Sequence, residues 1–246
     1  DYMSGLVRGD FGTSIRTGRP VAHQLFTRYP ATFELAVVGM FIAMSIAVIG
    51  GVVAATHHNT LIDNLTMAGA LFGVSMPSFW RGLMLMFLFS LLLGWLPVSG
   101  RGTPFTLEWI KHIILPAVTL GIGSAAYLVR LIRSSMLEIL NEEYIKTARS
   151  KGLKERYVIY RHALKNAFIP IVTMAGMQFG YLLGGTVVIE TVFAWPGVGR
   201  LIINSVFARD FPTVQGAILM LALSFALVNL LVDLTYAFLD PRIRYS

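Results

Sequence analysis

The chain of 246 residues is 55% hydrophobic and 13% charged, about half the charged share of an average soluble domain. It carries a formal net charge of +7 and no cysteine, which excludes disulfides and thiolate metal sites. No nucleic-acid-binding motif accompanies the charge, so the basic excess indicates the positive-inside bias of a membrane protein. We therefore expect an all-α polytopic membrane protein.

Five membrane spans are predicted, because a span takes about 20 predominantly apolar residues. The second is interrupted: residues 64–100 hold one charge, Arg81, and Pro77 breaks or kinks a helix. We expect a lead-in over 65–76 and the main part of that span over 78–95. The other four predicted spans are 35–55, 113–132, 166–189 and 213–232.

The basic residues predict the orientation. Residues 130–167 hold nine Lys or Arg and the C-terminus adds two, against eight on the other side. We therefore place this loop in the cytoplasm and the N-terminus outside. Because the chain would then begin outside without a signal peptide, we expect that a first span is absent from this sequence.

These assignments divide the chain into segments. We expect an extracytoplasmic N-terminal segment over 1–30, a membrane domain over 31–240 and a cytoplasmic tail over 241–246. Within the membrane domain lie a cytoplasmic loop, 135–167, and two extracytoplasmic loops, 96–112 and 190–212. Three tryptophans fall near predicted membrane interfaces, as in an aromatic belt: Trp95, Trp109 and Trp195.

The predicted cytoplasmic loop has the signals of two short helices. Asn141 is a candidate N-cap, two glutamates follow in the first turn, and Gly152 marks a C-terminal stop. A second amphipathic helix is expected from about Lys154. Tyr144, Ala148 and Gly152 follow one another at four-residue spacing and so share a small face. This face suits either lipid headgroups or the close approach of another protein.

Eight stretches of the chain, in order, resemble the inner-membrane permeases of dipeptide, oligopeptide and nickel ABC importers. The stretches are RYPATFELA (28–36), GVSMPSFWRGL (73–83), GWLPVSGRG (94–102), LPAVTLGIGSAAYLVRLIRSSMLEIL (115–140), EEYIKTARSKGL (142–153), RHALKNAFIP (161–170), ETVFAWPGVGRLI (190–202) and NLLVDLTYAFLDPRIRY (229–245).

The resemblance implies a type I ABC importer permease fold, usually of six spans, of which this chain would hold five. It also implies that the cytoplasmic loop is the "EAA" loop, which docks into a cleft of an ATP-binding subunit. The loop departs from the EAA-x3-G pattern at Lys146-Thr147-Ala148 and carries Lys165 at the usual proline position. The implied coupling residues are Glu142, Glu143, Tyr144, Thr147, Ala148, Arg149, Gly152, Leu153, Arg161 and His162.

The implied partners are a second permease, two ATPases, an extracytoplasmic binding protein and membrane lipid. The chain has no GxxxxGK(S/T) loop, so ATP and Mg would be held by the ATPases and this chain would not be an enzyme. Di- or oligopeptides are the expected substrate, with nickel, a metallophore or glutathione as alternatives. From another class, an ATP-independent channel or carrier stays open.

Small and polar residues in the spans are candidates for helix packing or for a translocation path. Gly176, Gly180 and Gly184 form a GxxxGxxxG ridge, which favours close helix packing. Intramembrane polar groups mark functional sites or pair with one another. The polar candidates are Arg81, Gln178, Glu190, Asn229 and Asp233. The pair His57-His58 is interpreted as a wet loop, and no metal site is predicted.

Overall fold

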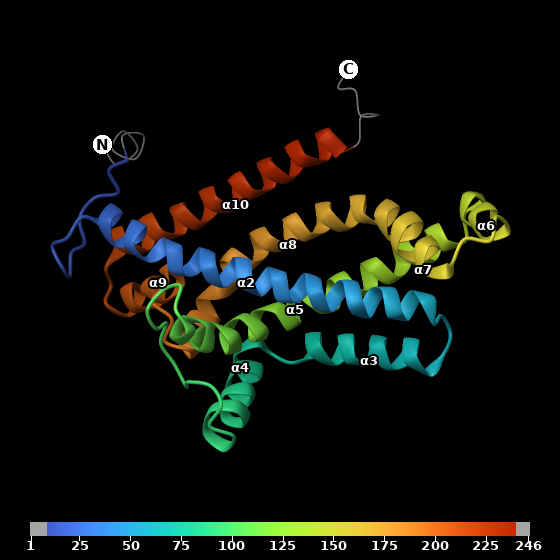
Figure 1. Cartoon of the computed structure of the whole chain (residues 1–246). Coiled ribbons are helices and arrows are strands. Elements are labelled where there is room, and N and C mark those ends of the chain that lie inside the picture. The colour runs from blue at the N-terminus through green and yellow to red at the C-terminus, as the bar shows by residue number, and fades with distance from the viewer. Residues whose placement is uncertain (1–8, 240–246) are drawn as a thin grey trace. The chain divides into compact units, whose positions relative to one another are not determined.

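The structure, a computed structural model, describes residues 9–239, and the elements named within this range are all helical (Figure 1). One isolated antiparallel bridge joins Thr13 and Pro20. The predicted tail 241–246, the first eight residues and the side chain of Asp233 lie outside the described residues.

Four long helices contain four of the predicted spans. They are α2 (Val21–Thr56), α5 (Leu107–Leu140), α8 (Leu164–Val192) and α10 (Phe211–Leu239). All four are long and apolar enough to cross a membrane, where a helix satisfies its backbone groups internally. Each is longer than predicted, and α2 begins at Val21, so the expected boundary at residue 30 falls inside a helix. Span signals in the sequence mark only the apolar part of a helix.

The second predicted span is broken into two arms. The chain forms α3 (Leu61–Ser75), then α4 (Ser78–Met86) and the π-helical η1 (Phe87–Leu92). Between them Met76 and Pro77 have extended backbone, with ψ of 128° and 139°, so the predicted break at Pro77 is confirmed. The described chain therefore has four spanning helices, or five if this broken pair counts as one span.

The chain divides into two compact units, each built from three separate stretches. The first unit is Asp1–Gly39, Pro77–Leu120 and Phe179–Leu227, and the second is Met40–Met76, Gly121–Gln178 and Val228–Ser246. The four long helices contribute residues to both units. Each unit is described separately below.

In the first unit, α9 (Val198–Phe207) packs on the beginnings of α2 and α10. Its buried Val198 and Leu201 contact Val21, Leu25 and Ala217. The turn before α10 is held by a second contact, in which the Ser14 hydroxyl and the Ile15 backbone N–H donate to Asp210. Burial raises the pKa of Asp210, but hydrogen bonds, chiefly from Ser14 and Thr213, outweigh it and hold the pKa below its usual value.

Glu190, near the end of α8, binds the first turn of α9. Its carboxylate is fully buried and accepts hydrogen bonds from the Thr32 hydroxyl at 2.7 Å and from the Arg200 backbone N–H at 2.8 Å. The Thr32 hydroxyl also accepts from the Val198 N–H at 2.8 Å. The carboxylate thus satisfies donors at the start of α9, where a negative charge also complements the helix dipole. These contacts favour the alternative in which Glu190 pairs with neighbouring polar groups.

Replacing Glu190 by alanine should lower the thermal stability of the solubilised permease. The change leaves the Arg200 N–H and the Thr32 hydroxyl buried without this acceptor, at a cost of about 2 kcal/mol or more. For a domain of this size that shifts the unfolding midpoint by roughly 4–8 °C. Thr191→Ala, on the exposed side of the same turn, is the control and should shift it by much less; equal shifts would contradict the anchoring role.

Trp195 corrects a prediction. It lies at 0% exposure, with its indole N–H donating to the Ala31 carbonyl oxygen at 2.8 Å, so it is a core residue of the first unit and not part of an aromatic belt. Trp109 donates to Glu34, which also binds Arg101 through two hydrogen bonds. Of the three tryptophans predicted to lie in an aromatic belt, Trp95 is the exposed one, at 65%.

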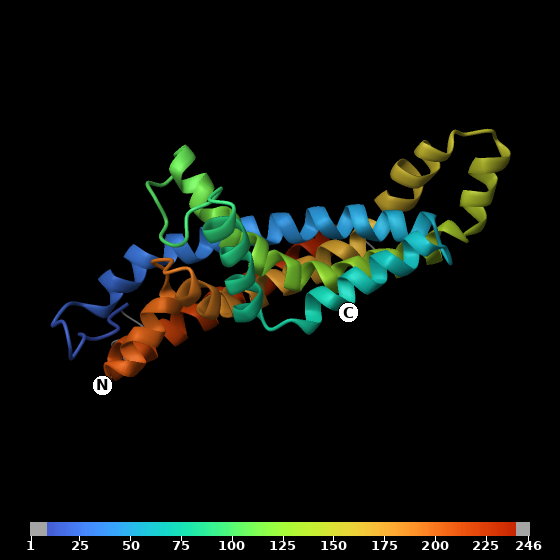
Figure 2. The same ribbon diagram turned by 90° about the horizontal axis from the view of Figure 1, so that it is seen from below.

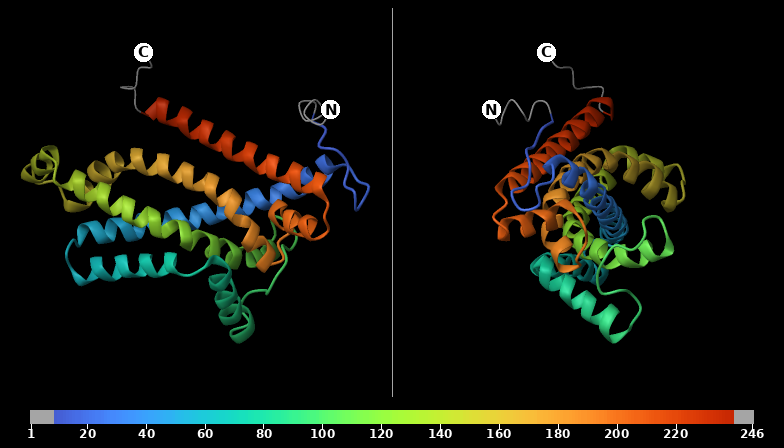
Figure 3. Two further views of the ribbon diagram at one scale, coloured as in Figure 1. Left: turned by 180° about the vertical axis from the view of Figure 1, so that it is seen from behind. Right: turned by 90° about the vertical axis from the view of Figure 1, so that its left-hand side faces the viewer.

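The second unit has a continuous apolar core around the later part of α5. Leu128, Ile132 and Met136 are fully buried there against α2 and α8, and α3 runs alongside the end of α2 (Figure 3). Asp63, at the start of α3, is 2% exposed and forms two short hydrogen bonds with Arg133 of α5, at 2.6 and 2.7 Å. The pair fixes α3 to α5.

In the glycine ridge of α8, Gly176 makes a close contact with another helix. A Cβ atom at Gly176 would overlap the Val232 side chain of α10, so α8 and α10 approach each other there because residue 176 has no side chain. Gly180 is buried, whereas Gly184 is exposed with nothing within 4 Å of its Cβ position. Within this chain, Gly176 is therefore in close helix packing, whereas Gly184 faces open space.

The same substitution at these two glycines should have opposite effects on the permease studied alone. Gly176→Ala forces α8 and α10 apart and should cost about 1–3 kcal/mol of stability. Gly184→Ala meets open space and should be neutral or stabilising, because alanine is the better helix former. Thermal unfolding in detergent measures both, and a stable Gly176→Ala variant would refute the close contact.

Candidate functional site

The predicted cytoplasmic loop forms a helical hairpin within the second unit. It consists of α6 (Glu143–Ser150), a turn, the short α7 (Glu155–Tyr157) and the π-helical η2 (Val158–Ala163), which continues into α8. Figure 2 shows the hairpin in olive and yellow between the end of α5 and the beginning of α8. The prediction of two helices is confirmed, including the second start at Lys154, which is the N-cap of α7.

The first helix begins one residue later than predicted. Glu142 is the N-cap, and the Asn141 side chain instead donates to the Leu137 carbonyl oxygen at the end of α5. An asparagine can hydrogen-bond either to the preceding or to the following helix, and the sequence does not distinguish the two. Glu143 lies in the first turn, as expected, and pairs with Lys146 at 2.7 Å.

Gly152 ends α6 in a Schellman motif. Its φ is +74°, a conformation that favours glycine, and its N–H donates to the Arg149 carbonyl oxygen. The Leu153 N–H donates to the Ala148 carbonyl oxygen, which completes the motif. The predicted stop at Gly152 is thus confirmed. A Cβ atom there would meet nothing within 4 Å, so the requirement for glycine within this chain is conformational.

The small face predicted over Tyr144, Ala148 and Gly152 is wrong at its centre. Ala148 is 8% exposed and packs with the fully buried Ile145 into the core of the second unit. Tyr144 is half-exposed, and its hydroxyl accepts a hydrogen bond from the Asn166 side chain of α8. Helical spacing correctly grouped these residues, but it could not show which side of α6 faces the protein.

An ion pair closes the hairpin across its turn. The Arg149 guanidinium donates to both carboxylate oxygens of Glu155, at 2.7 and 3.3 Å. This hydrogen bond holds the pKa of Glu155 below its usual value and raises the pKa of Arg149. Both side chains are about half-exposed, so we expect this ion pair to contribute little to the free energy of unfolding. Its main effect is on the geometry of the turn. This pairing has no signal in the sequence, because a separation of six residues falls outside helical neighbour spacing.

The remaining predicted coupling residues are spread over the hairpin surface. Glu142, Glu143 and Thr147 are exposed on α6, and Leu153 is 43% exposed in the turn. Arg161 is exposed and His162 half-buried in η2. These residues thus offer mixed charges and the apolar side chain of Leu153 to a partner, while Ala148 packs inside the chain.

The predicted path residues are divided between the two units. Arg81 belongs to the first unit, where it is 8% exposed and donates from Nε to the Thr119 carbonyl oxygen at 3.0 Å. Gln178 and Asn229 belong to the second unit. The buried Oδ1 atom of Asn229 has no hydrogen-bond partner among the described residues, which removes the support for an interhelical bond through that atom.

The described geometry, with four long apolar helices and a charged hairpin between two of them, is that of a polytopic membrane protein. Residues 46–245 match the family model described as "Binding-protein-dependent transport system inner membrane component". The chain belongs to this family. It is accordingly a permease subunit of an ABC importer and a multi-pass protein of the bacterial inner membrane.

Two relatives match across almost the whole chain. The dipeptide transport system permease protein DppB of Alkalihalophilus pseudofirmus is 44% identical over 99% of this chain and 80% of its own length. The glutathione transport system permease protein GsiC of Escherichia coli (strain K12) is 45% identical over 100% of this chain and 78% of its own length.

Solved structures are similar in fold. The methionine ABC transporter MetNI in an inward-facing conformation has a TM-score of 0.73 at 17% identity, over 88% of this chain and 96% of that one. An amino acid ABC transporter with histidines has a TM-score of 0.64 at 14% identity, over 99% of each chain. These likenesses support the expected all-α importer permease fold.

Proposed function

We propose that this permease carries di- or oligopeptides across the membrane. The observation that carries the proposal is the identity of 44–45% over nearly the whole chain to permeases named for dipeptide and glutathione transport. Both substrates contain peptide bonds, so peptide-like molecules are the shared chemistry. Glutathione is the second candidate because one of the two relatives is named for it. Nickel or a metallophore is a further candidate from the sequence, but neither of the two relatives is named for it.

We further propose that the hairpin of residues 142–163 couples the permease to two ATP-binding subunits. Its position between α5 and α8 supports this role, because a force on it is transmitted to two long helices directly. ATP and Mg would be bound by those subunits. A second permease would complete the translocation path.

The extracytoplasmic binding protein is proposed to dock on segments 94–112 and 190–212. Large apolar side chains are exposed there, including Phe105 and Phe207 at 85% each, and such exposure is typical of interaction sites. The buried bonds of Glu190 and Trp195 would hold the second segment in shape for that contact.

The test is uptake into proteoliposomes that hold the full-length permease, its partner permease, the ATPases and the binding protein. Labelled dipeptide, glutathione and nickel are offered in parallel, with and without ATP inside. We expect ATP-dependent uptake of a peptide. Uptake of nickel alone would overturn the substrate, and uptake without ATP would overturn the coupling mechanism.

A further inference from the structure

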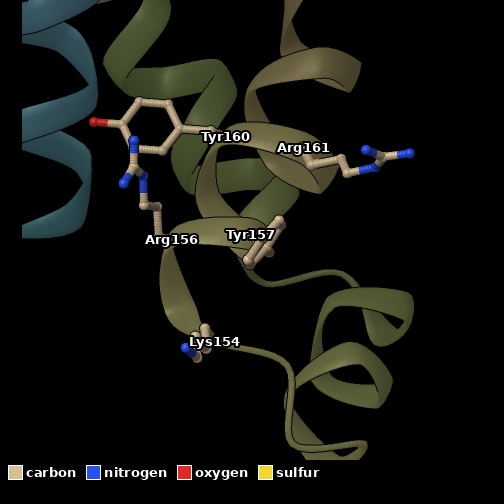
Figure 4. A pocket seen from close by; sticks show the side chains of 5 residues that line it. All are labelled: Lys154, Arg156, Tyr157, Tyr160 and Arg161. Carbon is tan, nitrogen blue, oxygen red and sulfur yellow. The ribbon is translucent and has the colours of Figure 1, made fainter.

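The second arm of the hairpin carries a cationic and aromatic pocket at the point where it leads into α8. The pocket has a volume of about 670 Å³ and is lined by Lys154, Arg156, Tyr157, Tyr160 and Arg161 (Figure 4). Among the described residues, its lining consists of three cationic and two tyrosine side chains and includes no carboxylate. Arg156 and Tyr160 extend to one side of the helix in Figure 4, whereas Arg161 projects to the other.

The cations of this pocket are not used in the ion pairs found among the described residues. Two of the loop's carboxylates pair elsewhere, Glu143 with Lys146 and Glu155 with Arg149. Tyr157 and Tyr160 are each 56% exposed. A site that concentrates positive charge with exposed phenol groups suits an anion that also has an apolar part.

The same helix continues from the pocket into a membrane span. Tyr157, Arg161, Lys165 and Phe168 follow one another at intervals of four, four and three residues, and all four are exposed. The apolar stretch that begins at Pro170 comes next. This face therefore presents a tyrosine, two cations and then a phenylalanine directly before the apolar stretch. Cationic and aromatic side chains next to a span are typical of the headgroup and interface region of a lipid bilayer.

We propose that this pocket binds the phosphodiester headgroup of an anionic membrane lipid, with an acyl chain lying along Phe168 toward the span. Basic residues on the cytoplasmic side of spans attract such headgroups, and each contributes enough binding free energy for roughly a fivefold change in affinity. The continuity with the spanning helix favours lipid over an acidic patch of an ATPase. The headgroup would then tie the second arm of the coupling hairpin to the membrane surface.

The test uses the complete importer in nanodiscs that contain a diazirine-labelled phosphatidylglycerol or phosphatidylcholine. Cross-links to the segment 152–170 are quantified by mass spectrometry. We expect phosphatidylglycerol to be preferred in the wild type and the preference to fall by about fivefold for each cation removed in Lys154→Gln/Arg156→Gln. Arg156→Lys should keep it, and so should Lys146→Gln/Lys151→Gln, which removes two charges from α6 and its end.

Three outcomes would overturn the proposal. One is an unchanged lipid preference in Lys154→Gln/Arg156→Gln. Another is displacement of the labelled lipid by inorganic phosphate, which would indicate a site for a soluble anion. The third is that Lys154→Gln/Arg156→Gln no longer binds the ATPase but still cross-links to phosphatidylglycerol. This result would indicate that the pocket binds the ATPase. ATP-dependent peptide uptake is measured separately, in phosphatidylcholine proteoliposomes. If no peptide is taken up, the proposed substrate is wrong, but the lipid cross-linking result can still be interpreted.

Discussion

Replacing Asp63 by alanine is expected to produce a large loss of stability in the second unit. The change leaves Arg133 without its bidentate partner, and the Asn59 backbone N–H, which donates to the same carboxylate, also loses its acceptor. Removal of one partner from a buried ion pair costs roughly 3–5 kcal/mol, and the 24% exposure of Arg133 places this pair near the lower end. Thermal unfolding in detergent should show a midpoint about 6–12 °C lower.

Two further variants test whether the loss of stability comes from the burial of this ion pair. Glu143→Ala breaks an ion pair of the same unit that is well exposed, with Glu143 at 87%, and should leave the midpoint almost unchanged. The double variant Asp63→Leu/Arg133→Met replaces both charges by apolar groups and should recover much of the stability. Equal midpoints for Asp63→Ala and Glu143→Ala would contradict a stabilising role for the buried Asp63–Arg133 pair.

This ion pair also shows where the sequence alone is insufficient. Asp63 and Arg133 lie 70 residues apart, and neither has a local signal that selects the other. The apolar runs predicted four long helices because lipid requires that composition throughout, and Pro77 predicted a break because it cannot continue a helix. Those features depend on local chemistry, whereas the pairing of distant charges depends on the tertiary structure.

The same distinction applies to the candidate site. Gly152 was correctly predicted as a helix stop, since a left-handed residue after a helix favours glycine. Ala148 was placed on a partner-facing surface, but it packs inward beside Ile145. A small residue at helical spacing is consistent with either environment, because close packing within a chain and close packing between chains have the same steric requirement.

Replacing Gly152 by valine is expected to reduce ATP-driven uptake by about tenfold or more, while the permease still inserts and assembles. A β-branched residue is disfavoured at φ +74° by about 1–2 kcal/mol, so the Schellman motif should open and α6 should change its position. ATPase activity that persists without matching uptake would show that the coupling, and not the ATPase, has failed. Normal uptake by Gly152→Val would contradict the proposed role of the hairpin.

Gly152→Asn and Gly152→Ala identify why glycine is needed at this position. Asparagine tolerates the left-handed conformation better than other residues, and its side chain meets nothing within this chain. If conformation is the only requirement, the asparagine variant should keep most of its uptake and the alanine variant should lie between asparagine and valine. If asparagine and alanine both fail as completely as valine, a partner must approach the Cα atom of residue 152 closely. That result would place the ATPase contact at the turn itself, beyond the end of α6, and not on the side of the helix where Ala148 was expected to lie.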